Sequence, residues 1–417
     1  MSACLSRQAI SSEFNEDELT SLRAQTPAWG RDAHFSHGSA SLPAMAVYAA
    51  WRRWLDAERS LGSRRAMEML SEELHSVHAS VAQLIGARPH QIALLDSASH
   101  AWAKAMASVL ATADDVHVVS TRDEYGSNSL CLLAAGEQIR LTVISGREEV
   151  KPLPQRLAEA LDQVPRRTRV IVSMSAVPTA YGVATNLSGV AKVVRQRDGL
   201  LFVDASHAVG QIPVDVKAIG CDVLVFPTRK WLRGPKGGAV LYVSDRGQER
   251  MGTPPDVDVA GAAWTGRSTL RAAASAQRFE GYEFNPGLRL AIKAACDETL
   301  RVGPQRIAQQ NTRVRAEIAS TLRERLGWEP LEGDHPRSTA LMTYALPSNA
   351  GDGRRLVQAL WGVGVNASAV GMQHARWALE AAGVSAVLRL TPHFLTGEEE
   401  IERLVQALVG QRAAGIA

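Results

Sequence analysis

Between residues 91 and 243, short apolar runs rich in β-branched residues alternate with stretches of helical periodicity, and this alternation restricts the possible folds most strongly. The runs occupy 91–95, 115–120, 140–145, 168–173, 199–203, 221–226 and 238–243. Helix-compatible stretches at 100–112, 153–163 and 187–197 separate several of them. Strands that alternate with helices predict a mainly parallel α/β sheet sandwiched by helices. Ligands bind such sheets beyond the carboxyl ends of the strands, so polar residues just after a strand are the first site candidates.

The regions on either side of this alternation predict two further parts of the chain. Residues 1–43 are irregular, and helical patterns follow at 44–59 and 66–86. After residue 285 two long amphipathic helices, two strands and a last helix are expected, at 286–301, 304–326, 339–345, 384–390 and from a Thr396–Glu399 capping box onward. We therefore predict an N-terminal arm (1–43) packing with the small domain, a large cofactor-binding domain (44–285) and a smaller α+β C-terminal domain (286–417).

Composition excludes several classes of protein. The 417 residues carry 46 Lys and Arg against 43 Asp and Glu, a net charge of +3 spread along the chain, which argues against a nucleic-acid surface. No stretch approaches the ~20 apolar residues of a membrane span, and the N-terminus does not resemble a signal peptide. The cysteines lack metal-type spacing and indicate a reduced, cytoplasmic protein without a metal site; they are Cys4, Cys131, Cys221 and Cys296.

Lysines are few, which makes a reactive amine easy to locate. The chain has seven, and most of them lie in helical patterns or polar connections. Lys230 lies in a Gly- and Pro-flanked loop between two apolar strands, where desolvation can lower the pKa of the amine and make it a nucleophile. Lys236 in the same loop is its only competitor. The alternative interpretation of Lys230 is an ordinary solvated loop lysine.

Other polar residues near strand ends are candidates for binding anions or cations. Asp204 ends the strand 199–203, where its carboxylate needs a cationic partner or serves as a helix N-cap. Ser97, Ser99 and His100 begin a helix after a strand, so their N–H groups and hydroxyls form an anion site or simply cap the helix. Arg389 lies in an apolar run, where it binds either a substrate carboxylate or an internal Asp or Glu.

Four motifs in chain order carry a resemblance to a known family. They are Asp204-x-x-His207, RKWLRGPKG at 229–237, RFEGYEFN at 278–285 and RLTPHF beginning at Arg389. Together they resemble the class V aminotransferase superfamily, which consists of fold-type-I enzymes dependent on pyridoxal 5′-phosphate. The resemblance covers nearly the whole chain, and within the superfamily it is greatest to the branch of isopenicillin N epimerase-like proteins and hercynylcysteine sulfoxide lyases.

The resemblance implies a role for each candidate. Lys230 corresponds to the catalytic lysine that carries the cofactor, Asp204 to the partner of its pyridine nitrogen, and Arg389 to the arginine that binds the substrate carboxylate. The implied cofactor-binding residues also include Ser99 and His100 at the phosphate, Thr228 or Arg229 beside them, Tyr125 stacked on the ring and His207 near the phenolic oxygen. Trp264 and Thr265 match a segment that reaches the partner subunit's phosphate, which implies a homodimer with active sites at the interface.

Departures from the family pattern narrow the expected reaction. His207 stands where a Gln is frequent, and VPTAYG lacks a common Asn near residue 180. The segment before Arg389 contains no cysteine, which argues against a persulfide-forming desulfurase. We expect a lyase that cleaves the C–S bond of an S-substituted cysteine by β-elimination. The alternatives are an aminotransferase, an oxidative deaminase or an epimerase, the last needing a second acid or base such as His207, His100 or Tyr125, and, outside catalysis, a binding protein.

Overall fold

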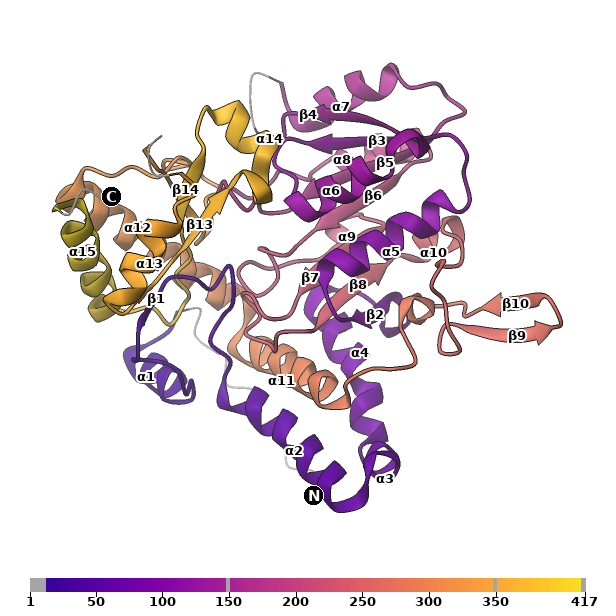
Figure 1. Cartoon of the computed structure of the whole chain (residues 1–417), viewed down its shortest axis with the longest axis horizontal. Helices are drawn as coiled ribbons and strands as arrows, with labels where there is room; N and C mark the ends of the chain where they lie inside the picture. Colours follow the sequence, from indigo (N-terminus) through magenta and orange to yellow (C-terminus); the bar gives the residue numbers. More distant parts are fainter. Residues whose placement is uncertain (1–12, 148–150, 348–350, 414–417) are drawn as a thin grey trace, which may run out of the picture.

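A seven-stranded sheet forms the centre of the larger part of the molecule (Figure 1). The computed structural model describes residues 13–147, 151–347 and 351–413. In sheet order the strands are β2 (Ile92–Leu95), β8 (Ala239–Val243), β7 (Val223–Pro227), β6 (Leu200–Asp204), β5 (Arg169–Ser175), β3 (Val116–Thr121) and β4 (Ile139–Ile144). The strands from β7 to β4 are mutually parallel, and β8 runs antiparallel to both of its neighbours. The expected fold class, a mainly parallel sheet between helices, is confirmed.

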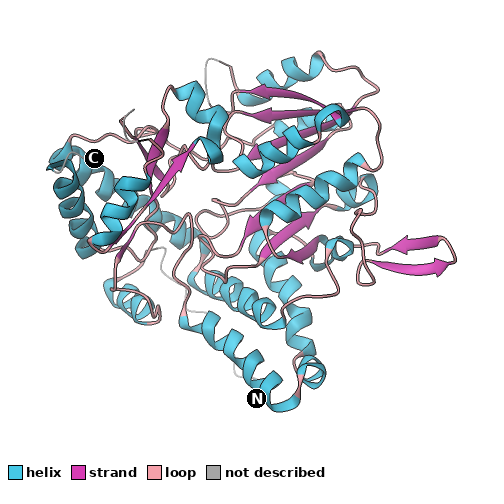
Figure 2. Cartoon of the chain, viewed as in Figure 1, coloured by secondary structure: helices cyan, strands magenta, loops and turns pink. Residues whose placement is uncertain are grey.

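Helices cover both faces of this sheet (Figure 2). One face packs against α2 (Met45–Leu61), α4 (Ser71–Ile85), α7 (Leu153–Asp162), α8 (Val190–Gln196) and α11 (Pro286–Val302). The other face packs against α5 (Ala98–Leu110) and α6 (Gly126–Ala134). The predicted helix at 66–86 is in fact divided at Leu70, between α3 (Ser63–Met69) and α4. Two short helices, α9 (Val216–Ile219) and α10 (Asp245–Arg250), complete this part.

The strand β6 illustrates how the sequence builds the sheet. Leu201 and Val203 belong to the apolar cluster on one face, whereas Leu200 and Phe202 belong to the cluster on the other. Successive side chains of a strand point to opposite faces, so a strand covered on both sides is apolar throughout. Asp204 is the first polar residue of this strand and lies at its carboxyl end.

The smaller part contains its own sheet and helices. Its antiparallel sheet has the order β11 (Met342–Ala345), β14 (Ala386–Leu390), β13 (Ser368–Gly371). Its helices are α12 (Pro304–Leu326), α13 (Arg354–Gly362), α14 (Met372–Ala382) and α15 (Glu398–Ala413). The N-terminal segment joins it, because β1 (Ala33–His34) pairs with β12 (Val365–Asn366). Helix α1 (Glu16–Ala24) packs through its apolar residues near Phe394. By contrast α11 packs against α2 and α4.

The start of α15 differs from the predicted capping box. The hydroxyl of Thr396 accepts a hydrogen bond from the backbone N–H of His393, at 3.0 Å, and so does not cap the helix. Glu399 is exposed, and it is the buried carboxylate of Glu400 that accepts the N–H of Gly397, at 3.2 Å. The predicted capping box is therefore wrong, and the glutamate at the start of the helix is Glu400, one position later than predicted. Glu400 also accepts the N–H of His34 from the N-terminal segment.

Two exposed strands form a hairpin that projects from the body of the molecule (Figure 1). They are β9 (Ala262–Gly266) and β10 (Thr269–Ala272), which pair antiparallel with Trp264 opposite Leu270. Trp264 is 84% exposed and Leu270 is 53% exposed. Apolar side chains of this size exposed together indicate a surface that contacts another molecule. Within the described residues, no helix is both long enough and apolar enough to span a membrane.

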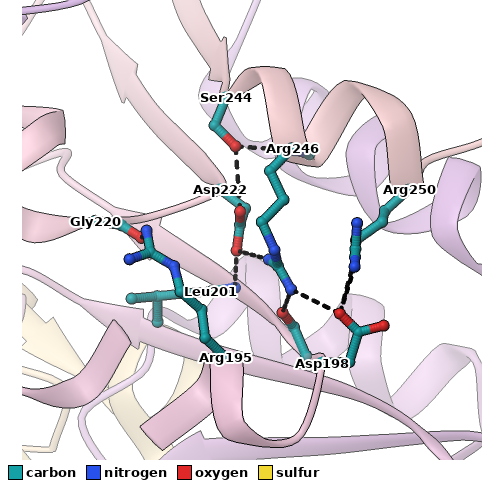
Figure 3. A network of polar contacts seen from close by, with 10 residues as sticks. Arg195, Asp198, Leu201, Gly220, Asp222, Ser244, Arg246 and Arg250 are labelled. Carbon is teal, nitrogen blue, oxygen red and sulfur yellow. Dashed lines mark hydrogen bonds and ion pairs between the residues drawn. The ribbon is translucent and has the colours of Figure 1, made fainter. Parts of the chain in front are cut away.

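An ionic network around the buried Asp222 fixes the starts of the strands that lead to the site (Figure 3). The carboxylate of Asp222, which is 2% exposed, accepts the N–H of Leu201 at 3.0 Å and the guanidinium of Arg246 at 2.9 Å. It also accepts the Ser244 hydroxyl at 3.1 Å, and Arg246 reaches Asp198 at 3.3 Å. These contacts tie together the beginnings of β6 and β7 and the end of β8, so the opposite ends of β6 and β7 are held side by side.

Candidate active site

Polar residues gather in a cavity at the carboxyl ends of the parallel strands. The cavity is lined by Ser97, Ser99, Tyr125, Asp204, Arg229 and Lys230, which come from the loops after β2, β3, β6 and β7. This is the edge at which open α/β sheets bind ligands. The structure therefore brings five of the predicted site residues to one cavity, namely Ser99, Tyr125, Asp204, Arg229 and Lys230.

Lys230 is the buried amine of this cavity. Its side chain lies 5.7 Å from the centre of the Tyr125 ring, and Nζ lies 3.2 Å from Nε2 of His207. Burial lowers the pKa of Lys230 to about 7, and Arg389 and Arg229 add to this effect while Asp204 opposes it. A lysine with such a pKa is a usable nucleophile at neutral pH. Its competitor Lys236 is exposed to solvent.

Asp204 is a buried carboxylate, and no helix begins after it. Its Oδ1 accepts the N–H of Ser206 at 2.8 Å, and its Oδ2 accepts the amide of Asn128 at 3.0 Å. The same Asn128 amide nitrogen also donates to Oε1 of Glu124, at 3.0 Å. The pKa of Glu124 is raised by burial and by the nearby Asp204. The helix-cap interpretation of Asp204 is therefore wrong. A second buried carboxylate, that of Glu124, is linked to Asp204 through the amide of Asn128.

The N-terminus of α5 supplies backbone donors at the edge of the cavity. Ser97 is the N-cap of this helix, because its hydroxyl accepts the N–H of His100 at 3.2 Å. Ser99 lies in the first turn beside the cavity. His100 does not line the cavity, and its ring pairs with Asp96 at the cavity's edge, with Nδ1 2.7 Å from Oδ1 of Asp96. The first turn of a helix attracts anions through its free N–H groups and its dipole.

The residues beside Lys230 differ in what they can contact. Arg229 lines the cavity and its guanidinium donates to the carbonyl oxygen of Ser39. The Thr228 hydroxyl is fully buried and donates within its own loop, to the carbonyl oxygens of Pro235 at 2.8 Å and Gly238 at 3.0 Å. Of the two donors considered for this position, the structure therefore brings only the Arg229 side chain to the cavity.

Arg389 is buried without a carboxylate partner among the described residues. Its guanidinium donates to the hydroxyls of Thr179 at 2.6 Å, Ser39 at 2.8 Å and Ser368 at 3.2 Å. Burial lowers the pKa of Arg389 to about 10, so it stays charged at neutral pH. The internal Asp or Glu partner considered for it is thus not found. A buried guanidinium held only by neutral groups is suited to an anionic ligand.

A larger cavity of about 720 Å³ adjoins Arg389 on the side of the smaller part. Ser39 and Ser368, which hold Arg389, both line it, as do Trp361 and His374. The His374 ring stacks on Tyr125 at a centroid distance of 6.2 Å. The two cavities are therefore neighbours across Tyr125 and Arg389. Trp264 and Thr265 lie on the exposed hairpin and do not line either cavity.

Sequence reasoning missed several residues of this site, namely Glu124, Asn128, Ser206, Trp231 and His374. Glu124 and Asn128 lie in the segment DEYGSN around Tyr125, and Trp231 directly follows Lys230 in the loop RKWLRGPKG. Their position beside candidate residues was the available signal. The contacts of Asn128 with Asp204 and of Trp231 with His207, however, join residues 76 and 24 positions apart, so only the structure could identify them.

Comparison with known proteins identifies the family. The model of the family "Aminotransferase class-V" matches residues 34–404. The chain belongs to the class V aminotransferases. A probable hercynylcysteine sulfoxide lyase of Mycobacterium tuberculosis is 26% identical over 387 residues, covering 91% of this chain and 90% of that protein. An isopenicillin N epimerase of Streptomyces clavuligerus is 26% identical, covering 80% and 83%. The predicted resemblance is thus confirmed.

Two further matches complete this comparison. An uncharacterised aminotransferase of Bacillus subtilis is 33% identical over 162 residues, and this match spans 42% of its length. Among solved structures, a cysteine desulfurase of Thermococcus onnurineus has a TM-score of 0.81 at 20% identity, covering 96% of this chain and 98% of that one. This likeness supports the fold-type-I architecture.

The residues present fit pyridoxal 5′-phosphate, the cofactor of class V aminotransferases. Lys230 offers an amine of lowered pKa for the aldehyde, and Asp204 offers a buried carboxylate for the ring nitrogen. The start of α5 and Arg229 offer donors for the phosphate. The chain is therefore a pyridoxal-phosphate-dependent enzyme of this family.

Proposed function

We propose that the protein is a C–S lyase that releases a thiol or sulfenate from an S-substituted cysteine by β-elimination. One observation carries this choice within the family. Residues 366–389, which run from the large cavity to Arg389, contain no cysteine that could take up sulfur as a persulfide. Of the described cysteines, Cys221 and Cys296 are buried in the core and Cys131 lies on α6. Where the C–S bond is cleaved, the sulfur therefore leaves with the departing group and is not passed to a cysteine of this segment.

The mechanism assigns separate tasks to three residues. Bound pyridoxal phosphate acidifies the α-hydrogen of an amino acid by withdrawing electrons from Cα. Arg389 holds the α-carboxylate, so that Cα lies near the amine of Lys230. Lys230 removes the α-proton, and Asp204 keeps the ring nitrogen protonated. The C–S bond then breaks with its electron pair on sulfur, and addition of water gives thiol, pyruvate and ammonia as the balanced products.

The remaining candidates support the cofactor in this proposal. Ser99, with the free N–H groups of the first turn of α5, and Arg229 bind the phosphate, Tyr125 stacks on the ring, and His207 contacts the phenolic oxygen. The exposed hairpin with Trp264 and Thr265 supports a homodimer in which each copy completes the other's phosphate site. The cysteine pattern is the basis for a cytoplasmic location, and the partner is a small amino acid rather than a nucleic acid or a membrane.

Elimination is favoured over epimerisation by the number of proton-transfer groups. Epimerisation needs an acid or base on each face of Cα. His207 contacts Nζ of Lys230 and so lies on the same side, and the His100 ring is paired with Asp96. Only Tyr125 of the three groups considered is left for the opposite face, next to His374. Aminotransfer and oxidative deamination use the same groups and remain the alternatives.

Product analysis tests the proposal. The purified enzyme is incubated with S-alkyl and S-conjugated cysteines, and the products are identified by mass spectrometry. Pyruvate with free thiol supports elimination, whereas a keto acid that retains sulfur indicates aminotransfer or oxidation, and inverted amino acid indicates epimerisation. K230A provides the inactive control, and K236A, which changes the exposed lysine of the same loop, is expected to keep activity.

A further inference from the structure

Trp231 forms a hydrogen bond whose direction is fixed by chemistry. The indole Nε1 of Trp231 lies 3.2 Å from Nδ1 of His207. An indole nitrogen can only donate a hydrogen bond, so Nδ1 of His207 must accept. Both side chains are buried, with Trp231 1% exposed and His207 3% exposed, so water does not offer either a replacement partner.

The other nitrogen of His207 then has a single possible state. With its lone pair on Nδ1, the neutral ring carries its proton on Nε2. Nε2 lies 3.2 Å from Nζ of Lys230. An ammonium group has three donors and no acceptor, so it would direct a hydrogen at the N–H of His207. The contact is a hydrogen bond only if Lys230 is a neutral amine that accepts from Nε2.

We infer that Trp231 is a positioning residue, which fixes the tautomer of His207 and thereby holds Lys230 as an uncharged, nucleophilic amine in the cofactor-free protein. The inference rests on the proposed role of Lys230 as the lysine that carries the cofactor. It adds a reason why that lysine reacts. Only a neutral amine has a lone pair on Nζ that can attack the aldehyde carbon of the cofactor, after which water leaves.

The surrounding packing holds Trp231 in place. Gly210 has φ +88°, and a Cβ at this position would lie 2.4 Å from the backbone N of Leu232 and C of Trp231. Glycine at 210 therefore allows the lysine loop to approach the segment that carries His207. On its other side, the carbonyl oxygen of Trp231 accepts from Nε2 of His393 at 3.1 Å.

Burial and two arginines favour the neutral form of Lys230 and of His207, whereas Asp204 favours the charged form of Lys230. Lys230 faces Asp204, Arg389 and Arg229, and burial is the largest influence on its pKa, which is about 7. Burial is the largest influence that lowers the pKa of His207 well below its usual value, and the charges of Arg389 and Arg229 act in the same direction. Neutral His207 and neutral Lys230 are therefore consistent with the direction of the hydrogen bonds.

The first test follows cofactor uptake by the full-length protein freed of cofactor. Pyridoxal phosphate is added at pH values from 5 to 10, and its condensation with the protein is followed by absorbance. Borohydride trapping and peptide mapping then show how much of the cofactor is attached to Lys230. We expect a midpoint near 7 in the wild type. In W231F the ring of His207 is free to present a lone pair to an ammonium, so the midpoint moves up by at least one pH unit. A move from 7 to 8 lowers the neutral fraction at pH 7 from about one half to about one eleventh, roughly fivefold in rate.

Two controls separate this effect from general loosening of the core. W102F changes another buried tryptophan, whose indole nitrogen has no hydrogen-bond partner, and should leave the midpoint unchanged. H207Q should also keep it, because a glutamine amide accepts from Trp231 with its oxygen and donates to Lys230 with its nitrogen. An unchanged midpoint in W231F would overturn the inference.

A second measurement needs no folded W231F variant. In protein labelled with nitrogen-15 histidine, the His207 signals are assigned by their loss in H207Q. We expect an unprotonated Nδ1 and a protonated Nε2, and a proton on Nδ1 would overturn the inference. If borohydride fixes the cofactor on a lysine other than Lys230, the proposed function fails instead, while the state of His207 is still read by the nitrogen signals.

Discussion

Replacing Arg389 by alanine should weaken amino-acid binding without changing how the cofactor is held. Arg389 is 6% exposed and donates only to neutral groups, so the substrate carboxylate would be its one anionic partner at this site among the described residues. Truncating one partner of a desolvated charge pair costs ~2–5 kcal/mol, and at ~1.4 kcal/mol per tenfold this is a loss of ~30- to ~4,000-fold in affinity.

The assay compares each amino acid with the amine that lacks its carboxylate. In R389A the affinity for the amino acid should fall by this factor, while affinity for the amine and the absorbance of the bound cofactor should stay the same. R278A is the matched control, because Arg278 is equally buried but donates to the carbonyl oxygens of Gln248 at 2.7 Å and Met251 at 3.1 Å. That variant should lose stability but not discriminate between the ligands. Equal losses for amino acid and amine in R389A would refute carboxylate recognition.

Three further variants test other parts of the molecule. D204A should reduce turnover by ~100-fold or more while phosphate binding is retained, as measured by kcat and by cofactor titration; near-normal turnover would contradict its electronic role. D222A removes a buried carboxylate from the half-buried Arg246, which keeps Asp198 at 3.3 Å, and should lower the free energy of urea unfolding by ~1.5–3 kcal/mol, with the uptake profile of Lys230 unchanged in the folded protein. Burial raises the pKa of Glu400 to about 7 in the folded protein, so the unfolded chain loses the proton of this carboxyl group at a lower pH. The free energy of unfolding of the wild type should therefore fall by about 3 kcal/mol between pH 4.5 and 7. E400Q should abolish that fall, and an unchanged pH dependence of unfolding would exclude Glu400 as its source.

Apolar periodicity was sufficient to predict the strands that carry the site. The run predicted at 199–203 is β6 at 200–204, and the helix predicted at 304–326 is α12 with the same bounds. Both patterns are strong because these elements bury almost every apolar residue they contain. The hairpin of β9 and β10 was missed, because its side chains are exposed and its sequence therefore lacks the alternation of a half-buried strand.

The candidate site could be predicted only as far as its residues follow strands or match family motifs. Asp204 and Lys230 satisfy both conditions, and the structure brings them to one cavity. The contact of Asn128 with Asp204 joins residues 76 positions apart, and that of Trp231 with His207 joins residues 24 apart. Neither pair has a periodic signature, since such contacts depend on how loops from different strands meet.

The charges of the site explain why a neutral Lys230 matters for ligand binding. Arg229 and Arg389 both disfavour a further positive charge on Lys230, whereas Asp204 favours it. The amide of Asn128 connects Asp204 to Glu124 by donating a hydrogen bond to each carboxylate. In the proposed function the cofactor brings a phosphate to Arg229 and the amino acid brings a carboxylate to Arg389, and neither arginine has a carboxylate partner among the described residues. The fixed charges therefore attract the two anions, whereas Lys230, kept neutral by His207 and Trp231, is left free to react.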